Sequence, residues 1–287
     1  AVLNRDDRSF APLDDYLAGR PVDVLTYGLE AAGAANDVTA TEIVYGPQET
    51  ALTLQLAGLS LPVRAPLPGA FNVHNMLAAS AAALALGIAS EAIRDGLEGQ
   101  SYLSGRMERV DRGQPFPVVV DFAHTPNALE RAIGAARAMI SPEGRVIAVF
   151  GSAGKRDVDK RRLMAEIAAR DAGLTVLTAE DPRTESLDDI LAMMAGAAAA
   201  VGGVEGEGFW RVPDRGRAIH FALTLARPGD IVLICGKGHE QSMCFGTVEY
   251  PWDDREATRA ALDAWLTGKA MVDLGLPTFN PGRDEGM

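Results

Sequence analysis

Apolar and polar residues follow two different patterns along the 287-residue chain. From about residue 103 onward, continuous apolar runs of four or five residues alternate with longer segments of helical period. The runs predict strands at 117–121, 146–150, 174–178, 209–212 and 231–235, and the segments predict helices at about 127–140, 160–171, 187–201, 215–226 and 254–266. Strands that are apolar on both faces are typical of a parallel sheet covered by helices on both sides. We therefore predict a doubly wound α/β domain over residues 103–268.

The first hundred residues have a different pattern. Short strand-like runs, such as 22–27 and 51–56, are separated by Gly, Pro and Asp, and two helices are expected at 72–86 and 90–99. Residues 100–105 form a plausible junction, so a first domain is predicted over 1–102. The segment from Lys269 to the end, 269–287, contains several Pro and Gly and is predicted to be a loosely ordered tail. Because the chain opens on Ala1-Val2-Leu3-Asn4, without an initiator Met, we expect a fragment, a processed chain or a trimmed one.

Composition narrows the kind of protein. With 47% apolar and 23% charged residues, the chain is typical of a soluble globular protein. A formal net charge of −12 without a basic cluster argues against nucleic acid and anionic membranes as partners. Only two cysteines occur, no run approaches 18 apolar residues, and no signal segment opens the chain. We therefore expect a cytoplasmic protein without membrane insertion.

Unusual residues gather directly after four of the predicted strands. These segments are 121–126, 151–157, 180–183 and 236–240, and they are rich in Gly, Arg, Lys, His and acidic residues. In a doubly wound sheet, ligands bind at the carboxyl ends of the strands. The sequence therefore predicts a site for a polar, charged ligand at this edge.

Each loop also has an ordinary structural interpretation. The glycine-rich segment 151–154 could cradle a phosphate or form a tight turn, and the chain contains no Walker A loop. Arg183 could clamp a carboxylate or pair with Glu185 at the surface. Glu240 could hold a substrate ammonium or be a loop carboxylate. His124 could cap the following helix or orient a nucleotide.

Two asparagines at the predicted start of the 72–86 helix are a further candidate site. Asn72 and Asn75 lie one helical turn apart, so their amides point the same way. An amide offers both a donor and an acceptor, which suits an adenine edge. The alternative is that Asn72 is the helix N-cap.

Taken in order, these segments resemble the Mur ligases. Residues 2–7 resemble a strand-end motif of the family's central ATPase domain, 69–79 its adenine-binding helix start, 105–108 its interdomain segment, and 120–126 the ligase motif whose Asp contacts the ATP ribose. Asp181-Pro182-Arg183 and Gly236-Lys237-Gly238-His239-Glu240 resemble the MurE branch. The resemblance implies a Rossmann-like, doubly wound α/β C-terminal ligase domain, preceded by the C-terminal portion of an α/β ATPase domain.

The resemblance also implies roles for individual residues. ATP would be bound by Asn72, Asn75, Arg106, Asp121 and His124, and the incoming amino acid by Arg156, Asp181, Arg183, Gly236 and Glu240. Diaminopimelate enzymes usually carry Asn where this chain has Asp181. An acid there would favour a distal ammonium, whereas Arg183 favours a distal carboxylate, so diaminopimelate, lysine and ornithine all remain open.

The implied reaction is ATP-dependent amide bond formation that adds a diamino acid to UDP-MurNAc-L-Ala-D-Glu in peptidoglycan synthesis, through an acyl phosphate. The expected cofactors are ATP and Mg²⁺, with metal ligands outside this chain, and a monomer is expected. Since the phosphate loop is absent, this chain alone should not turn over ATP. The alternatives are a folylpolyglutamate synthetase-like ligase, a MurE-like amidating subunit, or a non-catalytic fragment that binds an amino acid or nucleotide.

Overall fold

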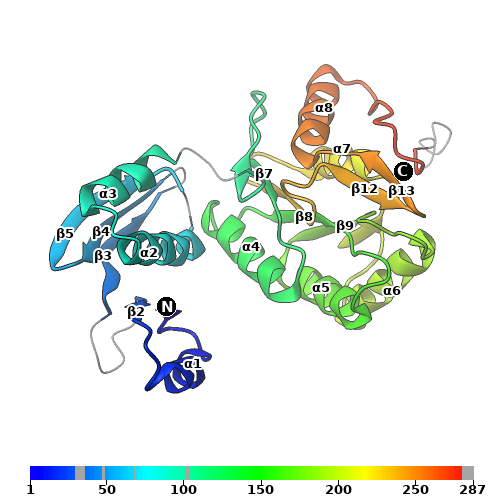
Figure 1. Cartoon of the computed structure of the whole chain (residues 1–287). Coiled ribbons are helices and arrows are strands. Elements are labelled where there is room, and N and C mark those ends of the chain that lie inside the picture. The colour runs from blue at the N-terminus through cyan, green and yellow to red at the C-terminus, as the bar shows by residue number, and fades with distance from the viewer. Residues whose placement is uncertain (30–35, 47–48, 68, 101–103, 280–287) are drawn as a thin grey trace. The chain divides into compact units, whose positions relative to one another are not determined.

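The structure is a computed structural model that describes residues 1–29, 36–46, 49–67, 69–100 and 104–279. The chain forms two compact units, Ala1–Leu103 and Ser104–Met287 (Figure 1). Each unit has its own core and is described by itself.

The first unit is a five-stranded sheet in the order β1-β2-β3-β4-β5. Its elements are β1 (Val2–Asn4), α1 (Phe10–Leu17), β2 (Leu25–Tyr27), β3 (Val38–Tyr45), β4 (Thr50–Leu56), β5 (Leu59–Ala65), α2 (Ala70–Ala85) and α3 (Ser90–Gly99). The first three strands are parallel, and β3, β4 and β5 are antiparallel. Along β4 fully buried residues alternate with partly buried ones, as expected for a strand with one face on a core. The sequence did not predict α1, β3 or β5.

The second unit contains a six-stranded sheet in the order β10-β9-β8-β11-β7-β6. Its strands are β6 (Glu108–Arg109), β7 (Val118–Asp121), β8 (Val146–Phe150), β9 (Leu174–Leu177), β10 (Phe209–Arg211) and β11 (Ile231–Cys235). Strands β7 to β11 are parallel, and only the short edge strand β6 is antiparallel. All five predicted strands of this domain are present.

Helices cover both faces of this sheet. The helices α4 (Pro126–Ala138), α5 (Val158–Asp171) and α6 (Leu187–Ala200) pack side by side on one face, and α7 (Arg215–Leu225) and α8 (Asp254–Thr267) pack together on the other (Figure 1). Every residue of β8 and β11 is therefore buried. The prediction of a doubly wound α/β fold is confirmed.

A small hairpin that the sequence did not predict follows β11. Its strands, β12 (Ser242–Phe245) and β13 (Val248–Pro251), are antiparallel and joined by a two-residue turn at Gly246, whose φ is +62°. The hairpin matters for the site because the segment after β9 is hydrogen-bonded to β12.

The prediction of a loosely ordered tail is wrong for residues 269–279. Met271 and Leu276 are buried in the core of the second unit, beside Ala218 and Ile219 of α7. The Thr278 hydroxyl donates a 2.9 Å hydrogen bond to the Asp214 carboxylate. Widely spaced apolar residues are enough to fix a segment that has no regular secondary structure.

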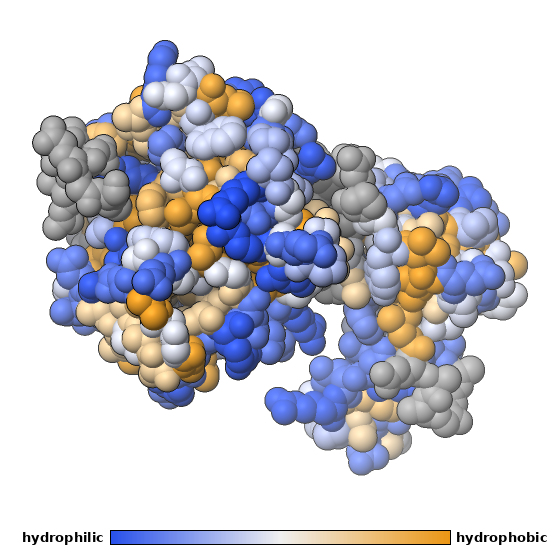
Figure 2. Space-filling model, turned by 180° about the vertical axis from the view of Figure 1, so that it is seen from behind, coloured by the Kyte–Doolittle hydropathy of each residue, from blue (hydrophilic) through white to orange (hydrophobic). Residues whose placement is uncertain are grey.

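Among the described residues, no helix is both long and apolar enough to cross a bilayer. On the face shown in Figure 2, hydrophilic side chains interrupt the apolar areas of each unit. Both cysteines are free thiols, and both are buried.

Candidate functional site

The topology brings the four polar loops to one edge of the second sheet. Strands β9, β8, β11 and β7 are neighbours and parallel, so the segments that follow them emerge together. The helix that follows β11 lies on the opposite face from those that follow β7 and β8. Connections that diverge in this way leave a crevice at the carboxyl ends of the strands.

The buried carboxylate of Asp121 anchors the first loop at the end of β7. Its two oxygens accept 2.8 Å hydrogen bonds from the backbone N–H groups of Met107 and Ala123. Burial raises the pKa of Asp121, although these hydrogen bonds and the nearby Arg106 lower it. The carboxylate thus fixes the 105–108 segment against the loop after β7.

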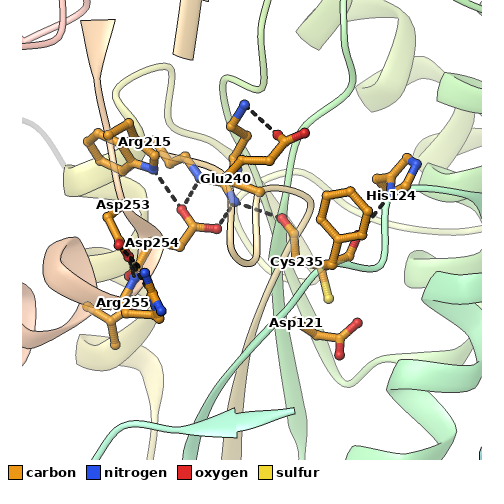
Figure 3. A network of polar contacts seen from close by, with 12 residues as sticks. Asp121, His124, Arg215, Cys235, Glu240, Asp253, Asp254 and Arg255 are labelled. Atoms are coloured by element: carbon orange, nitrogen blue, oxygen red, sulfur yellow. Dashed lines mark hydrogen bonds and ion pairs between the residues drawn. The ribbon is translucent and has the colours of Figure 1, made fainter. Parts of the chain in front are cut away.

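Aromatic and cationic side chains surround Phe122. The Arg106 guanidinium lies 4.6 Å from the centre of the phenyl ring, and the rings of His124 and His239 lie 4.4 and 4.8 Å from it. The His124 Nδ1 atom is 2.9 Å from the Phe122 carbonyl oxygen (Figure 3). The capping interpretation of His124 is wrong, because Thr125 accepts the hydrogen bond from Ala128 N at the start of α4.

Two glycines allow the 105–108 segment to approach the loop after β11. Gly105 and Gly238 have φ values of +63° and +52°, and a Cβ at Gly105 would overlap the Gly238 and His239 backbone. A Cβ at Gly238 would in turn meet the Cα of Phe122 at 2.7 Å. Larger residues at either position would force these loops apart.

The glycines after β8 likewise allow two loops to pack closely together. A Cβ at Gly151 would lie 2.5 Å from the Thr178 carbonyl oxygen, and one at Gly154 would overlap the Pro182 backbone. The Gly154 N–H donates a 2.9 Å hydrogen bond to the Asp181 carbonyl. The 151–154 segment is therefore packed against the 180–183 segment, whatever else it binds.

Glu180 is the most perturbed carboxyl group in these loops. Burial raises its pKa to about 7, against the lowering effects of Lys160, Arg215 and Lys237. Its Oε2 atom is buried and has no hydrogen-bond partner among the described residues. A Cβ at Gly236 would overlap this carboxylate, so Gly236 makes room for it.

The next residue, Asp181, is bound to a buried ammonium group. Lys237 Nζ lies 3.0 and 3.1 Å from the two Asp181 oxygens and 2.7 Å from Oε2 of Glu240. The Lys237 side chain is 2% exposed, whereas those of Asp181 and Glu240 are 18% and 43% exposed. The Cys244 N–H also donates to Asp181 Oδ1, at 2.8 Å. Two of the residues assigned to the amino-acid site are thus held together by a lysine that was not assigned to it.

Arg183 is fixed by its backbone to the hairpin. Its N–H donates to the Cys244 carbonyl at 3.0 Å, and its carbonyl accepts from Gly246 N at 2.7 Å. The proposed surface pair with Glu185 is wrong, because the Glu185 carboxylate is bound by Arg161 and by the Lys155 N–H instead. The buried Arg183 Nε has no partner in the described part of the chain.

The positive φ values of three residues in these loops indicate local strain. Lys155, Asp181 and Arg183 have φ values of +55°, +40° and +53°. Non-glycine residues adopt such conformations at a small energetic cost, and they are enriched at functional sites. Ser152, in the same region, has a buried hydroxyl oxygen without a partner among the described residues.

An arginine that the sequence did not single out joins the bases of two loops. Arg215, at the start of α7, donates to the carbonyls of Ala179 and Cys235 at 3.1 and 2.8 Å. Its guanidinium also forms two 2.7 Å hydrogen bonds with Asp254, and both side chains are 0% exposed (Figure 3). Ala179 and Cys235 directly precede Glu180 and Gly236, so this ion pair positions both loops.

The remaining predicted residues are Arg156, Asn72 and Asn75. Arg156 is exposed in the turn before α5. Asn72 and Asn75 belong to the first unit, where the Asn75 amide nitrogen is 3.3 Å from the Asn72 amide oxygen. The N-cap interpretation of Asn72 is wrong, since Gly69 is the N-cap of α2. Asn72 is 1% exposed and Asn75 is exposed.

Two further features bear on what this unit can bind. A cavity of about 500 Å³ lies between the hairpin and α8, where Gln241, Trp252, Ala260 and Leu274 are among its lining residues. None of the predicted site residues lines it. In the described segments, no group of three or more His, Cys, Asp or Glu side chains is placed to hold a metal ion.

Sequence comparisons assign both units to one family. A profile described as Mur ligase middle domain matches residues 1–83, and one described as Mur ligase, glutamate ligase domain, matches residues 105–238. The chain therefore belongs to the Mur ligase family.

Curated relatives narrow this to one branch. The chain is 43% identical over 264 residues to the UDP-N-acetylmuramyl-tripeptide synthetase of Roseiflexus sp. (strain RS-1), covering 91% of this chain and 50% of the relative. It is 39% identical over 273 residues to the UDP-N-acetylmuramoyl-L-alanyl-D-glutamate–2,6-diaminopimelate ligase of Geobacter metallireducens, covering 91% of this chain and 52% of that enzyme. These relatives are MurE-type ligases, and the chain spans about half their length.

Solved structures agree. A UDP-N-acetylmuramoyl-L-alanyl-D-glutamate–2,6-diaminopimelate ligase matches with a TM-score of 0.57 at 34% identity, over 92% of this chain and 53% of that one. A folylpolyglutamate synthase from Thermotoga maritima matches with a TM-score of 0.60 at 14% identity, over 93% and 54% of the two chains. At that identity the second match shows a shared fold only.

Proposed function

We propose that this chain supplies the amino-acid-binding domain, and part of the ATP-binding domain, of an ATP-dependent cytoplasmic ligase. The ligase adds a diamino acid to UDP-MurNAc-L-Ala-D-Glu in peptidoglycan synthesis. The observation that carries the proposal is the group of charged side chains in the loops at the carboxyl ends of the parallel strands. There, the buried Lys237 holds the carboxylates of Asp181 and Glu240, and Arg183, two residues after Asp181, has a buried Nε without a partner among the described residues.

The reaction needs positioned groups more than a nucleophilic side chain. The terminal carboxylate of the UDP-MurNAc-peptide takes the γ-phosphoryl group of ATP, and the neutral amine of the diamino acid then attacks the acyl carbon. The new C–N bond forms as the C–O bond to phosphate breaks, and the amine loses a proton. The proposed work of this chain is to hold the amino acid so that its amine reaches the acyl phosphate. Mg²⁺ would neutralise phosphate charge when bound, and the described residues of this chain offer no cluster of metal ligands.

The geometry favours diaminopimelate over lysine or ornithine. The Asp181 carboxylate is already occupied by the Lys237 ammonium and the Cys244 N–H, so it is not a free partner for a distal ammonium. The buried Arg183 Nε lacks an acceptor among the described residues, and a distal carboxylate would supply one. Glu240, bound to Lys237 but 43% exposed, remains accessible to the distal ammonium of the same amino acid.

The nucleotide part of the proposal is made for each unit by itself. In the first unit, Asn72 and Asn75 would bind an adenine; in the second, Arg106, Asp121 and His124 would contact a nucleotide. In support of this, the side chains of Arg106, His124 and His239 lie around the Phe122 ring. Together they provide aromatic and cationic groups that a nucleotide can contact. Asp121 is fixed by two backbone N–H groups, as a residue that binds a ribose hydroxyl should be.

Calorimetric titration of the chain with meso-diaminopimelate, L-lysine, L-ornithine and L-glutamate tests the amino-acid site. We expect diaminopimelate to bind most tightly, and Arg183→Met to weaken it about tenfold or more because a charge-assisted hydrogen bond is lost. Arg112→Met, which removes an exposed arginine paired with Asp263, is the matched control and should leave binding unchanged. Tighter binding of glutamate would favour a folylpolyglutamate-type ligase, and binding of none of the four would overturn the proposal.

A separate assay addresses turnover. ATP, UDP-MurNAc-L-Ala-D-Glu and meso-diaminopimelate are supplied to the 287-residue chain, and release of phosphate is followed. Since the chain spans half of its relatives, we expect no turnover. Detectable ligation by this chain would show that no further segment is needed.

A further inference from the structure

Lys237 is a buried charged side chain at the proposed amino-acid site. It is 2% exposed, and its ammonium group has three N–H donors that face three carboxylate oxygens, two of Asp181 and one of Glu240. A buried ammonium is costly unless it is paired in this way. The lysine is buried, whereas the side chains of both its partners, Asp181 and Glu240, are partly exposed to solvent.

The charges around this lysine balance. Asp181 and Glu240 contribute two negative charges, and Lys237 and Arg183 contribute two positive ones. Nearby, Arg215 is bound to Asp254, and the charge of Lys160 acts to lower the pKa of the buried Glu180, which burial raises to about 7. These four residues, Asp181, Glu240, Lys237 and Arg183, have a net charge of zero; Arg156, which is also assigned to the amino-acid site, is exposed in the turn before α5 and is not counted with them.

We propose that Lys237 is a specificity-determining residue, which cancels the charge of Asp181 and so makes the site select an amino acid with a zwitterionic distal end. This inference rests on the proposed function and extends it. A diaminopimelate distal end carries one carboxylate and one ammonium. These match Arg183, whose buried Nε has no partner among the described residues, and the accessible carboxylate of Glu240. A lysine or ornithine distal end carries only an ammonium, and it would match a site of net charge −1.

Lys237 acts through its partners rather than on the ligand. Its side chain is buried behind Asp181 and Glu240, so it is a positioning residue. It also explains why an acid can occupy position 181 without turning the site into one for a distal cation: the charge of Asp181 is cancelled by that of Lys237.

Four variants test the proposal by calorimetric titration with meso-diaminopimelate and L-lysine. In Lys237→Met the site has a net charge of −1, and we expect the ratio of lysine affinity to diaminopimelate affinity to rise roughly tenfold, the effect of one unit charge at a few ångströms in a partly exposed site. In Asp181→Asn the site has a net charge of +1, and the ratio should fall. In the double variant the charge is again zero, and the wild-type ratio should return. Lys269→Met, which removes an exposed lysine after α8, is the matched control and should not change the ratio.

The outcomes separate the two hypotheses. If the wild-type chain binds neither amino acid, the proposed function fails. If it prefers diaminopimelate but Lys237→Met weakens both ligands by the same factor, Lys237 is only structural and this inference is overturned. If Lys237→Met does not fold, as judged by tryptophan fluorescence, Asp181→Asn and the double variant decide. An unchanged ratio in Asp181→Asn, or a failure of the double variant to restore the wild-type ratio, refutes the inference.

Discussion

Replacing Arg215 by methionine should destabilise the second unit by about 3–5 kcal/mol, the cost of removing one partner of a buried ion pair. The arginine and Asp254 are 0% exposed, so the variant would leave a buried carboxylate whose remaining side-chain partner is the Trp252 indole N–H, at 2.8 Å. The carbonyls of Ala179 and Cys235 would lose their donors as well. Few surface substitutions approach this cost.

Tryptophan fluorescence during urea unfolding measures the effect on the second unit alone. The three tryptophans of the chain, Trp210, Trp252 and Trp265, all belong to that unit. The change in the free energy of unfolding follows from the shift of the midpoint at constant slope. Trp252 contacts Asp254, so circular dichroism should be recorded in parallel to confirm the midpoint.

Two further variants separate the cost of an unpaired charge from the loss of contacts. Arg112→Met breaks an ion pair whose side chains are 44% and 51% exposed, and should cost about 0–1 kcal/mol. Combining Arg215→Met with Asp254→Leu removes both buried charges and should recover much of the loss. A cost below about 1 kcal/mol for Arg215→Met, or no recovery in the double variant, would show that the buried pair does not dominate the stability of these loops.

Two other outcomes are expected. Gly151→Ala should destabilise the second unit by at least about 1 kcal/mol, because the new Cβ would press on the Thr178 carbonyl. The control Gly134→Ala, on the exposed face of α4, should stabilise the unit by about 0.5–1 kcal/mol. Equal midpoints of urea unfolding for the two variants would contradict the steric argument. The pKa of Glu180 is about 7 in the folded chain and 4.5 in an unfolded one, so the proton stabilises the fold fully below pH 4.5, and this contribution is lost as pH rises through 7. Glu180→Gln should remove this dependence, which amounts to up to about 1.4 kcal/mol per pH unit between pH 4.5 and 7. Urea unfolding of variant and wild type at several pH values measures it. If the free energy of unfolding changed with pH equally in both proteins, the raised pKa of Glu180 would be ruled out as a cause.

The second unit could be predicted closely because its sheet is parallel and covered on both faces. Strands such as Val146–Phe150 are then continuous apolar runs that end where a polar loop begins, so the loops and their common edge follow from the order of elements. The first unit has antiparallel strands with half-exposed faces. Along β3 and β5 apolar residues are mixed with Thr, Glu, Ser and Arg, which hides the strand pattern.

Features that depend on distant pairing could not be predicted. The turn at Gly246-Thr247 is not one of the strong hairpin signals, so β12 and β13 remained hidden. Arg215 is separated by 36, 20 and 39 residues from Ala179, Cys235 and Asp254, and in the sequence it marks only the start of a helix. The order of residues 269–279 could not be predicted for the same reason, because their few apolar side chains are fixed only by packing against a core formed by distant residues.

Asp181 shows how far a single residue can mislead when its partner is unknown. As a lone acid in the loop it favours a cationic ligand, yet two of the three Lys237 hydrogen-bond acceptors are its own oxygens. An asparagine at the same position would offer that lysine only one oxygen, and the ammonium would then depend more strongly on Glu240. By satisfying most of Lys237, Asp181 leaves Glu240 freer to meet a ligand ammonium. The acid at position 181 is therefore better understood as support for the lysine than as a contact that chooses the amino acid.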